Sequence, residues 1–308
     1  RYLSRILCGR VIRCNQLDHP INYAVLFLNK LHRKNCIVFY TCCFLISYGW
    51  LAFNGLLLHQ LSPVFFINRL DFSLNLLFLT GIQNAVIDNY WLQFLLDAIY
   101  LSSTLVLVFT TLLNNRFQYA AALFSVALNF IYALLISSLT ALSMEGFVCW
   151  ILLPVIFILK SETAFYYGLH TMRYIFLLIF FSAGLWKIRA GGIFNVEQMS
   201  AILLLQHSSY ITADPGNWFS KFIIYLVNNT WLSYSIYLIA TLAEIAFIIG
   251  FFTKKADKLL ILTFVLFAVF DLFLMRINYF SWLSFLFCLW YAKYSLPAAD
   301  ATITVENG

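Results

Sequence analysis

The stretch Trp231–Phe252, WLSYSIYLIATLAEIAFIIGFF, decides the fold of this 308-residue chain. It contains a single charged residue, Glu244, and about 20 apolar residues in a helix cross the roughly 30 Å hydrocarbon core of a bilayer. Seven more apolar runs accompany it, so the sequence predicts an all-α, polytopic membrane bundle of about eight transmembrane helices. The other predicted spans are Cys36–Leu58, Tyr90–Leu113, Phe117–Leu142, Phe147–Leu159, Arg173–Lys187, Leu259–Met275 and Tyr279–Tyr294.

The composition supports a membrane protein and excludes several other classes. Apolar residues make up 63% of the chain and charged residues only 10%, with a mean hydropathy of +0.86. A soluble domain carries roughly a quarter charged residues, so an ordinary soluble enzyme is excluded. The net charge of +6 does not indicate nucleic-acid binding, because the basic residues lie between apolar runs rather than on one solvated face.

The basic residues predict the orientation and the organisation of the chain. They gather before the first span and in alternate loops, which by the positive-inside rule places both termini in the cytoplasm, with a bacterial inner membrane as the expected location. Residues 1–35 form a basic arm whose helical apolar spacing fits the surface of an anionic leaflet. Residues 36–295 form the transmembrane domain, and residues 296–308 are expected to be a disordered cytoplasmic tail.

Two segments outside the spans have their own patterns. Pro63–Gly81 is apolar but contains Asn68, Arg69, Asp71 and Asn75, which favours an interfacial or re-entrant segment. Residues 188–230 form the largest extracytosolic piece, and they contain two amphipathic candidates, Val196–Leu205 and Trp218–Val227. Thr212–Asn217 between these candidates has the composition of a turn.

Four ionisable residues stand out inside the predicted spans, where a charge is costly and therefore points to a function. For each of them a structural role competes with a functional one. A buried acid could cap or pair with a neighbouring helix, a terminal lysine could extend to the interface, and Asp271 could pair with Arg276 or with Lys187. The four residues are Asp97, Lys187, Glu244 and Asp271.

Lys187 stands at the outer mouth of its predicted span. The small residues Ala183 and Gly184, one turn earlier, permit a close approach of another helix, which would hold the amine in a crevice. A lysine desolvated in an apolar pocket can act as a base, whereas one that faces a carboxylate stays charged. Glu244 lies near the middle of its span, so it must be neutral or paired.

The five histidines show no pair at the spacing of metal ligands, so no metal site is expected. The chain also lacks a P-loop, a dinucleotide-binding glycine pattern and a Ser/His/Asp arrangement.

The motif Phe181-Ser182-Ala183-Gly184-Leu185-Trp186-Lys187-Ile188 resembles the aromatic-x-Ala-Gly-x-x-Lys-aliphatic signature of the horizontally transferred transmembrane (HTTM) family. This family includes the membrane domain of vitamin K-dependent gamma-carboxylases and the sporulation-delaying protein B group. DoxX-like membrane proteins share part of the motif. The order of elements after Arg173 is also similar: an outer amphipathic segment, a span with Glu244, a basic turn at Lys254–Lys258 and two closing spans.

The resemblance implies that Lys187 matches the carboxylase lysine held to deprotonate the reduced vitamin. Other parts of the carboxylase pattern are missing. The turn Ser137–Glu145 has neither the His nor the Asn of the carboxylase motif, and Asp271 stands where relatives often carry His. The large extracytosolic carboxylase domain has no counterpart here, so glutamate carboxylation is not expected.

Two functional hypotheses follow, of which the first is a protein that acts on a lipid-soluble cofactor, such as a quinone, or on an exported peptide. Lys187 and Asp271 are then the candidate catalytic residues, and Trp186, Glu244 and Asp97 the candidate cofactor-binding residues. The second hypothesis is a non-catalytic membrane partner or maturation subunit for a secreted peptide or protein complex. In both cases we expect the protein to contact membrane lipid and not to bind nucleic acid.

Overall fold

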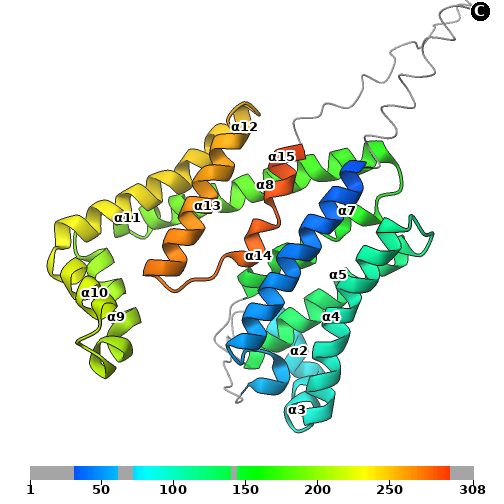
Figure 1. The fold of residues 1–308 in the computed structure, drawn as a ribbon, viewed down its shortest axis with the longest axis horizontal. Helices are drawn as coiled ribbons and strands as arrows, with labels where there is room; N and C mark the ends of the chain where they lie inside the picture. The colour runs from blue at the N-terminus through cyan, green and yellow to red at the C-terminus, as the bar shows by residue number, and fades with distance from the viewer. Residues whose placement is uncertain (1–30, 62–71, 140–143, 292–308) are drawn as a thin grey trace, which may run out of the picture.

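The computed structural model describes residues 31–61, 72–139 and 144–291, and all elements within these ranges are helices (Figure 1). This agrees with the predicted all-α class. Helices satisfy their backbone hydrogen bonds within one segment, which is what an apolar solvent requires of a spanning chain. Most of the basic arm and the predicted disordered tail lie outside the described residues.

Five helices in the described part of the chain are long and apolar enough to cross a membrane. The N-terminal one begins at Leu31 and continues to residue 53, followed by the 3-10 turn η1 (Leu58–Gln60). All five overlap predicted spans. The other four are α4 (Tyr90–Leu112), α5 (Gln118–Leu139), α8 (Glu162–Arg189) and the run Thr230–Phe252, which comprises α11 (Thr230–Ile245), η4 (Ala246–Ile248) and α12 (Ile249–Phe252).

Helix α8 is longer than predicted because it begins at Glu162 rather than at Arg173. The Ser161 hydroxyl caps it, accepting a hydrogen bond from the Ala164 backbone N–H at 3.1 Å. The charge of Arg173 does not end the helix, since its fully buried guanidinium forms two hydrogen bonds with Asp257, of 2.6 and 2.9 Å. A charge paired in this way can lie inside a helical bundle.

The other three predicted spans are shorter, interrupted or more charged. Phe147–Leu159 divides into η2 (Met144–Phe147), α6 (Val148–Leu152) and α7 (Val155–Ile158) around Pro154, which has no N–H to continue a helix. The last predicted span divides into α14 (Phe280–Leu283) and α15 (Leu286–Tyr291). Helix α13 (Asp257–Leu274) is long enough at 18 residues but contains three ionisable residues.

The segment Pro63–Gly81 is not a long helix in its described part. Helices α2 (Phe72–Thr80) and α3 (Ile82–Ile87) meet at Gly81, whose φ of 68° is in the left-handed region that glycine adopts without strain. Two short helices joined in this way are compatible with the predicted re-entrant or interfacial segment. Residues 62–71 of this segment lie outside the residues that the structure describes.

The two segments predicted to be amphipathic form a helical hairpin at one end of the molecule (Figure 1), in which apolar residues gather on one face of the second helix but not of the first. Helices α9 (Gln198–Ala213) and α10 (Trp218–Asn228) follow the short η3 (Gly192–Phe194). The turn predicted over Thr212–Asn217 is confined to Asp214–Asn217, because α9 continues to Ala213. The hairpin packs on α11 over its own small core. That core consists of Met199, Leu203, Phe219, Ile223, Leu226, Tyr237 and Leu274.

A larger core joins the remaining helices and fixes the position of α8. Helix α8 packs against α11, α7 and α15, while α4 and α5 pair on the opposite side of the molecule (Figure 1). Tyr100 and Tyr132 stack between α4 and α5 with ring centroids 3.8 Å apart. Helix α8 therefore touches both halves of the chain, and its C-terminal turns face the hairpin end.

Candidate functional site

An ion pair connects α8 and α11 in the half of the molecule that faces the hairpin. The Lys187 ammonium donates a hydrogen bond of 2.8 Å to Oε1 of Glu244. Glu244 is 4% exposed and the Lys187 side chain 29% exposed. Glu244 was expected to be neutral or paired, and the structure pairs it with Lys187.

Gly184 explains why the two helices are close enough for this pair. A Cβ atom at position 184 would lie 2.8 Å from Cγ1 of Ile245 and 3.2 Å from Cβ of Glu244. Contacts of this length do not occur between carbon atoms without displacement, so α11 reaches α8 at this point only because position 184 has no side chain. The predicted close approach at the small residues is confirmed.

Two aromatic rings flank the Lys187 ammonium. The nitrogen lies 5.7 Å from the centroid of the Tyr237 ring and 6.0 Å from that of Phe267. Both distances are within the range at which the face of a ring attracts a cation. The rings and Glu244 together hold the partly exposed ammonium against α11 and α13.

Two adjoining cavities open beside the ion pair, and we refer to them together as the ion-pair cavity. The larger has a volume of about 770 Å³ and the smaller about 560 Å³. Lys187, Trp186 and Asp271 line the larger cavity, and Glu244 lines both. The residues common to the two walls are Ile179, Ala183, Glu244, Ile277, Tyr279 and Trp282.

One polar atom of the ion-pair cavity has no partner in the described structure. Oε2 of Glu244 is buried and accepts no hydrogen bond, whereas Oε1 is occupied by Lys187. A buried carboxylate oxygen without a donor is costly, so this atom is a ready acceptor for a hydroxyl, amine or water that enters the cavity.

Asp271 lies on the same cavity but forms neither of the ion pairs considered for it. It is within electrostatic range of Lys187 and Glu244, without a contact that counts as a salt bridge in the described part of the chain. The Arg276 guanidinium instead lies 4.8 Å from the centroid of the Phe219 ring. Asp271 is therefore a second acid facing the same space.

Helix α9 covers the ion-pair cavity from the hairpin side. Met199 and Ile202 line the larger cavity, and Gln206 lines the smaller one. The hairpin is fastened to the end of α13 by the His207 ring, whose Nε2 lies 2.6 Å from the Leu274 carbonyl oxygen. Part of the predicted outer segment is thus a wall of the cavity.

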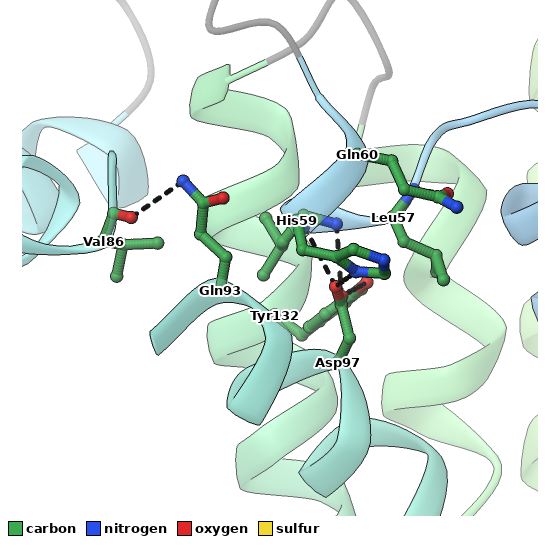
Figure 2. A network of polar contacts seen from close by, with 8 residues as sticks. Leu57, His59, Gln60, Val86, Gln93, Asp97 and Tyr132 are labelled. Carbon is green, nitrogen blue, oxygen red and sulfur yellow. Dashed lines mark hydrogen bonds and ion pairs between the residues drawn. The ribbon is translucent and has the colours of Figure 1, made fainter. Parts of the chain in front are cut away.

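Asp97 belongs to a different place, shown in Figure 2, and lines neither cavity. Its Oδ1 accepts hydrogen bonds from the Tyr132 hydroxyl at 2.6 Å and the Leu58 N–H at 3.2 Å. Its Oδ2 accepts one from the His59 N–H at 3.1 Å and lies 2.6 Å from His59 Nδ1. The carboxylate is fully partnered, and it holds the η1 turn against α4 and α5.

The sequence did not predict the partners of two buried charges, Asp97 and Arg173. His59 and Tyr132 complete the Asp97 network, and Asp257 neutralises Arg173. Apolar runs identify helices but not how the helices rotate and align against one another. The spacing of residues along the chain therefore could not predict these pairs. The one available signal was that a charge inside a span requires a partner on the same side of the membrane.

No family model, curated protein or solved structure matches the chain. The class is therefore defined by the fold and the apolar helices: this is a helical, multi-pass membrane protein. In the described residues, no group of three His, Cys, Asp or Glu side chains gathers as a metal site would.

Proposed function

We propose that the chain is an HTTM-like membrane protein that binds a lipid-soluble, quinone-like molecule or an exported peptide in the ion-pair cavity. The single observation that carries this proposal is the paired but incompletely satisfied Glu244 in the wall of two adjoining cavities. Cavities of this size suit a small organic ligand, with mostly apolar walls and a few polar groups to orient it.

The residues present fit an aromatic ring that carries oxygen atoms. Trp186, Phe270 and Trp282 supply apolar surface, while the ammonium of Lys187 can donate to a ring oxygen. The free Oε2 of Glu244 can accept from a ring hydroxyl. A bound quinone would supply reversible redox chemistry, and Asp271 is placed to exchange a proton with the same space.

The ion pair changes the role expected for Lys187. With its ammonium bonded to Glu244, Lys187 serves as a hydrogen-bond donor and anion anchor, and it becomes a base only if the ligand displaces the carboxylate. Glutamate carboxylation is not part of the proposal, for the reasons given by the missing carboxylase motif.

The proposed topology has eight membrane segments, with α6–α7 and α14–α15 counted as short, broken ones. Both termini would then lie in the cytoplasm of a bacterial cell, and the hairpin with the ion-pair cavity would face the outer side of the inner membrane. The excess of Lys and Arg in alternate loops supports this orientation.

A second candidate function is a non-catalytic partner or maturation subunit for a secreted peptide or protein. The hairpin end favours it, since large apolar side chains are exposed there and could contact another chain. In that case the ion pair only fastens α8 to α11. The exposed residues are Phe194, Leu205, Trp218, Tyr225 and Trp231.

Mass spectrometry of the molecules that co-purify with the protein separates the two functions. The protein would be purified in mild detergent as wild type, as Lys187→Met and as the control Lys221→Met, which changes an exposed lysine of α10. A quinone bound near one per chain in wild type and control, and reduced at least tenfold in Lys187→Met, would support the first function.

A stoichiometric peptide without a quinone would instead support the second function if the Lys187 substitution leaves its amount unchanged. Absence of both molecules from the wild-type protein would contradict both proposals.

A further inference from the structure

A third cavity lies away from the ion-pair cavity, at the start of α13. Its volume is about 160 Å³, and we call it the lysine cavity. Arg173, whose partner Asp257 lines this cavity, precedes Lys187 by 14 positions on α8, so the two sites are about 21 Å apart along that helix at 1.5 Å per residue. The lysine cavity is lined by Lys254, Lys255, Asp257, Lys258, Ile261, Leu289 and Trp290.

The positive charge of the lysine cavity is not compensated by its own acid. Both carboxylate oxygens of Asp257 are bonded to the buried guanidinium of Arg173, at 2.6 and 2.9 Å. No salt bridge in the described part of the chain involves Lys254, Lys255 or Lys258. Three exposed lysine residues therefore line a cavity whose carboxylate is already paired with Arg173.

Two basic residues of α8, His170 and Arg173, lie close to Lys254. Its ammonium lies 3.4 Å from His170 Nε2 on α8. Partial burial, and then the charge of Arg173, lower the pKa of Lys254 from its usual value, although Asp257 acts in the opposite direction. An anion placed here would relieve the repulsion between these groups.

The remaining wall of the lysine cavity is apolar. Ile261, Leu289 and the partly exposed Trp290 face the same space as the lysines. Tryptophan is typical of the depth at which lipid headgroups meet the hydrocarbon, and Lys and Arg there attract anionic lipids. A free phosphate ion would use the ammonium groups but would leave the apolar wall uncovered.

We propose that the lysine cavity binds the phosphate headgroup of an anionic phospholipid from the adjacent leaflet. The three ammonium groups contact the phosphate, while Ile261, Leu289 and Trp290 contact the glycerol and the upper acyl carbons. This site is separate from the ion-pair cavity and does not depend on the ligand proposed there.

Native mass spectrometry of the full chain in uncharged detergent tests this site. Phosphatidylglycerol and phosphatidylcholine with identical acyl chains would be titrated in turn, and inorganic phosphate would be added as a competitor. The test variant is Lys254→Gln/Lys255→Gln/Lys258→Gln. The matched control, Lys34→Gln/Lys160→Gln/Lys221→Gln, removes the same charge from other exposed lysines.

The wild type and the control should bind phosphatidylglycerol roughly tenfold more tightly than phosphatidylcholine, and the test variant should lose this preference. Three outcomes would overturn the proposal. The first is an unchanged preference in the test variant. The second is no preference in the wild type, as expected if another segment covers the lysines. The third is displacement of the lipid by millimolar phosphate, which would indicate a site for the free ion.

Discussion

Glu244 is the residue on which the ion-pair cavity depends, because it is buried, charged and bonded through only one of its two oxygen atoms. Removal of one partner of a buried ion pair leaves the other charge without compensation, and this costs more than removal of both. The energetics of Glu244 and Lys187 should therefore be strongly coupled.

We predict that Glu244→Leu alone destabilises the protein by about 2 kcal/mol, because Lys187 is then left unpaired beside an apolar wall. The double variant Lys187→Met/Glu244→Leu should recover most of that loss. Thermal unfolding in detergent, with Lys221→Met as control, measures both. A double variant that unfolds no later than Glu244→Leu would contradict the claim that the unpaired Lys187 charge causes the loss.

Asp97 is the contrasting case, since all its hydrogen-bonding capacity is used inside the fold. Asp97→Asn places an amide N–H against atoms that are themselves donors, such as the backbone N–H groups of Leu58 and His59. We expect a loss of about 2–4 kcal/mol of stability.

The control for this substitution is Asp88→Asn, which changes an exposed acid just before α4 and should be nearly neutral in the same unfolding measurement. A folded Asp97→Asn protein that unfolds at the wild-type temperature would contradict the structural role of Asp97.

At the scale of elements, the contact between α8 and α11 decides whether the cavity forms. Gly184→Ala puts a methyl group 2.8 Å from Ile245 Cγ1, so the helices must separate, at a cost of about 1–3 kcal/mol. Gly49→Ala is the matched control, because a Cβ at this helical position meets nothing within 4 Å.

We predict a lower unfolding temperature for Gly184→Ala and a slightly higher one for Gly49→Ala, since alanine favours a helix more than glycine does. The opposite order would mean that α8 and α11 do not approach each other at Gly184.

The sequence predicted the helical elements better than their ends. Apolar runs identify helices directly, and Ala183-Gly184 correctly indicated a close helix contact. Hydropathy averages over a local interruption, so it predicts continuous helices around Pro154 and Ser284, where the structure has breaks. The start of α8 was misplaced because Arg173 was taken to lie at the boundary of a span, whereas Asp257, distant in sequence, neutralises it inside the bundle.

At the scale of the whole molecule, the two proposed sites occupy different ends of the bundle. The sequence could supply the four ionisable residues within spans, but not which of them meet, because that depends on how the helices rotate against one another. Folding brings Lys187, Glu244 and Asp271 to one cavity and places Asp97 in another network. The tertiary structure therefore separates Asp97 from the other three ionisable residues, although the sequence gives no reason to distinguish them.

The proposed orientation predicts that Lys221 on α10 and Lys255 before α13 lie on opposite sides of the membrane. In spheroplasts, a membrane-impermeant maleimide should label Lys221→Cys but label Lys255→Cys only after permeabilisation. Both cysteines would be introduced after Cys42, the exposed cysteine of the described part, and Cys8 and Cys14, which lie outside the described residues, have been changed to Ser. Labelling of both positions from the same side would contradict the proposed topology.

The most direct test of the proposed function is the amount of quinone that co-purifies with a protein whose cavity is intact but has lost its ion pair. Lys187→Met/Glu244→Leu should be folded, and its extracts can be compared with wild type by quantitative mass spectrometry. We predict about one quinone per chain in the wild type and at least tenfold less in the double variant. Equal quinone content in the two proteins would contradict a ligand-binding role for Lys187 and Glu244.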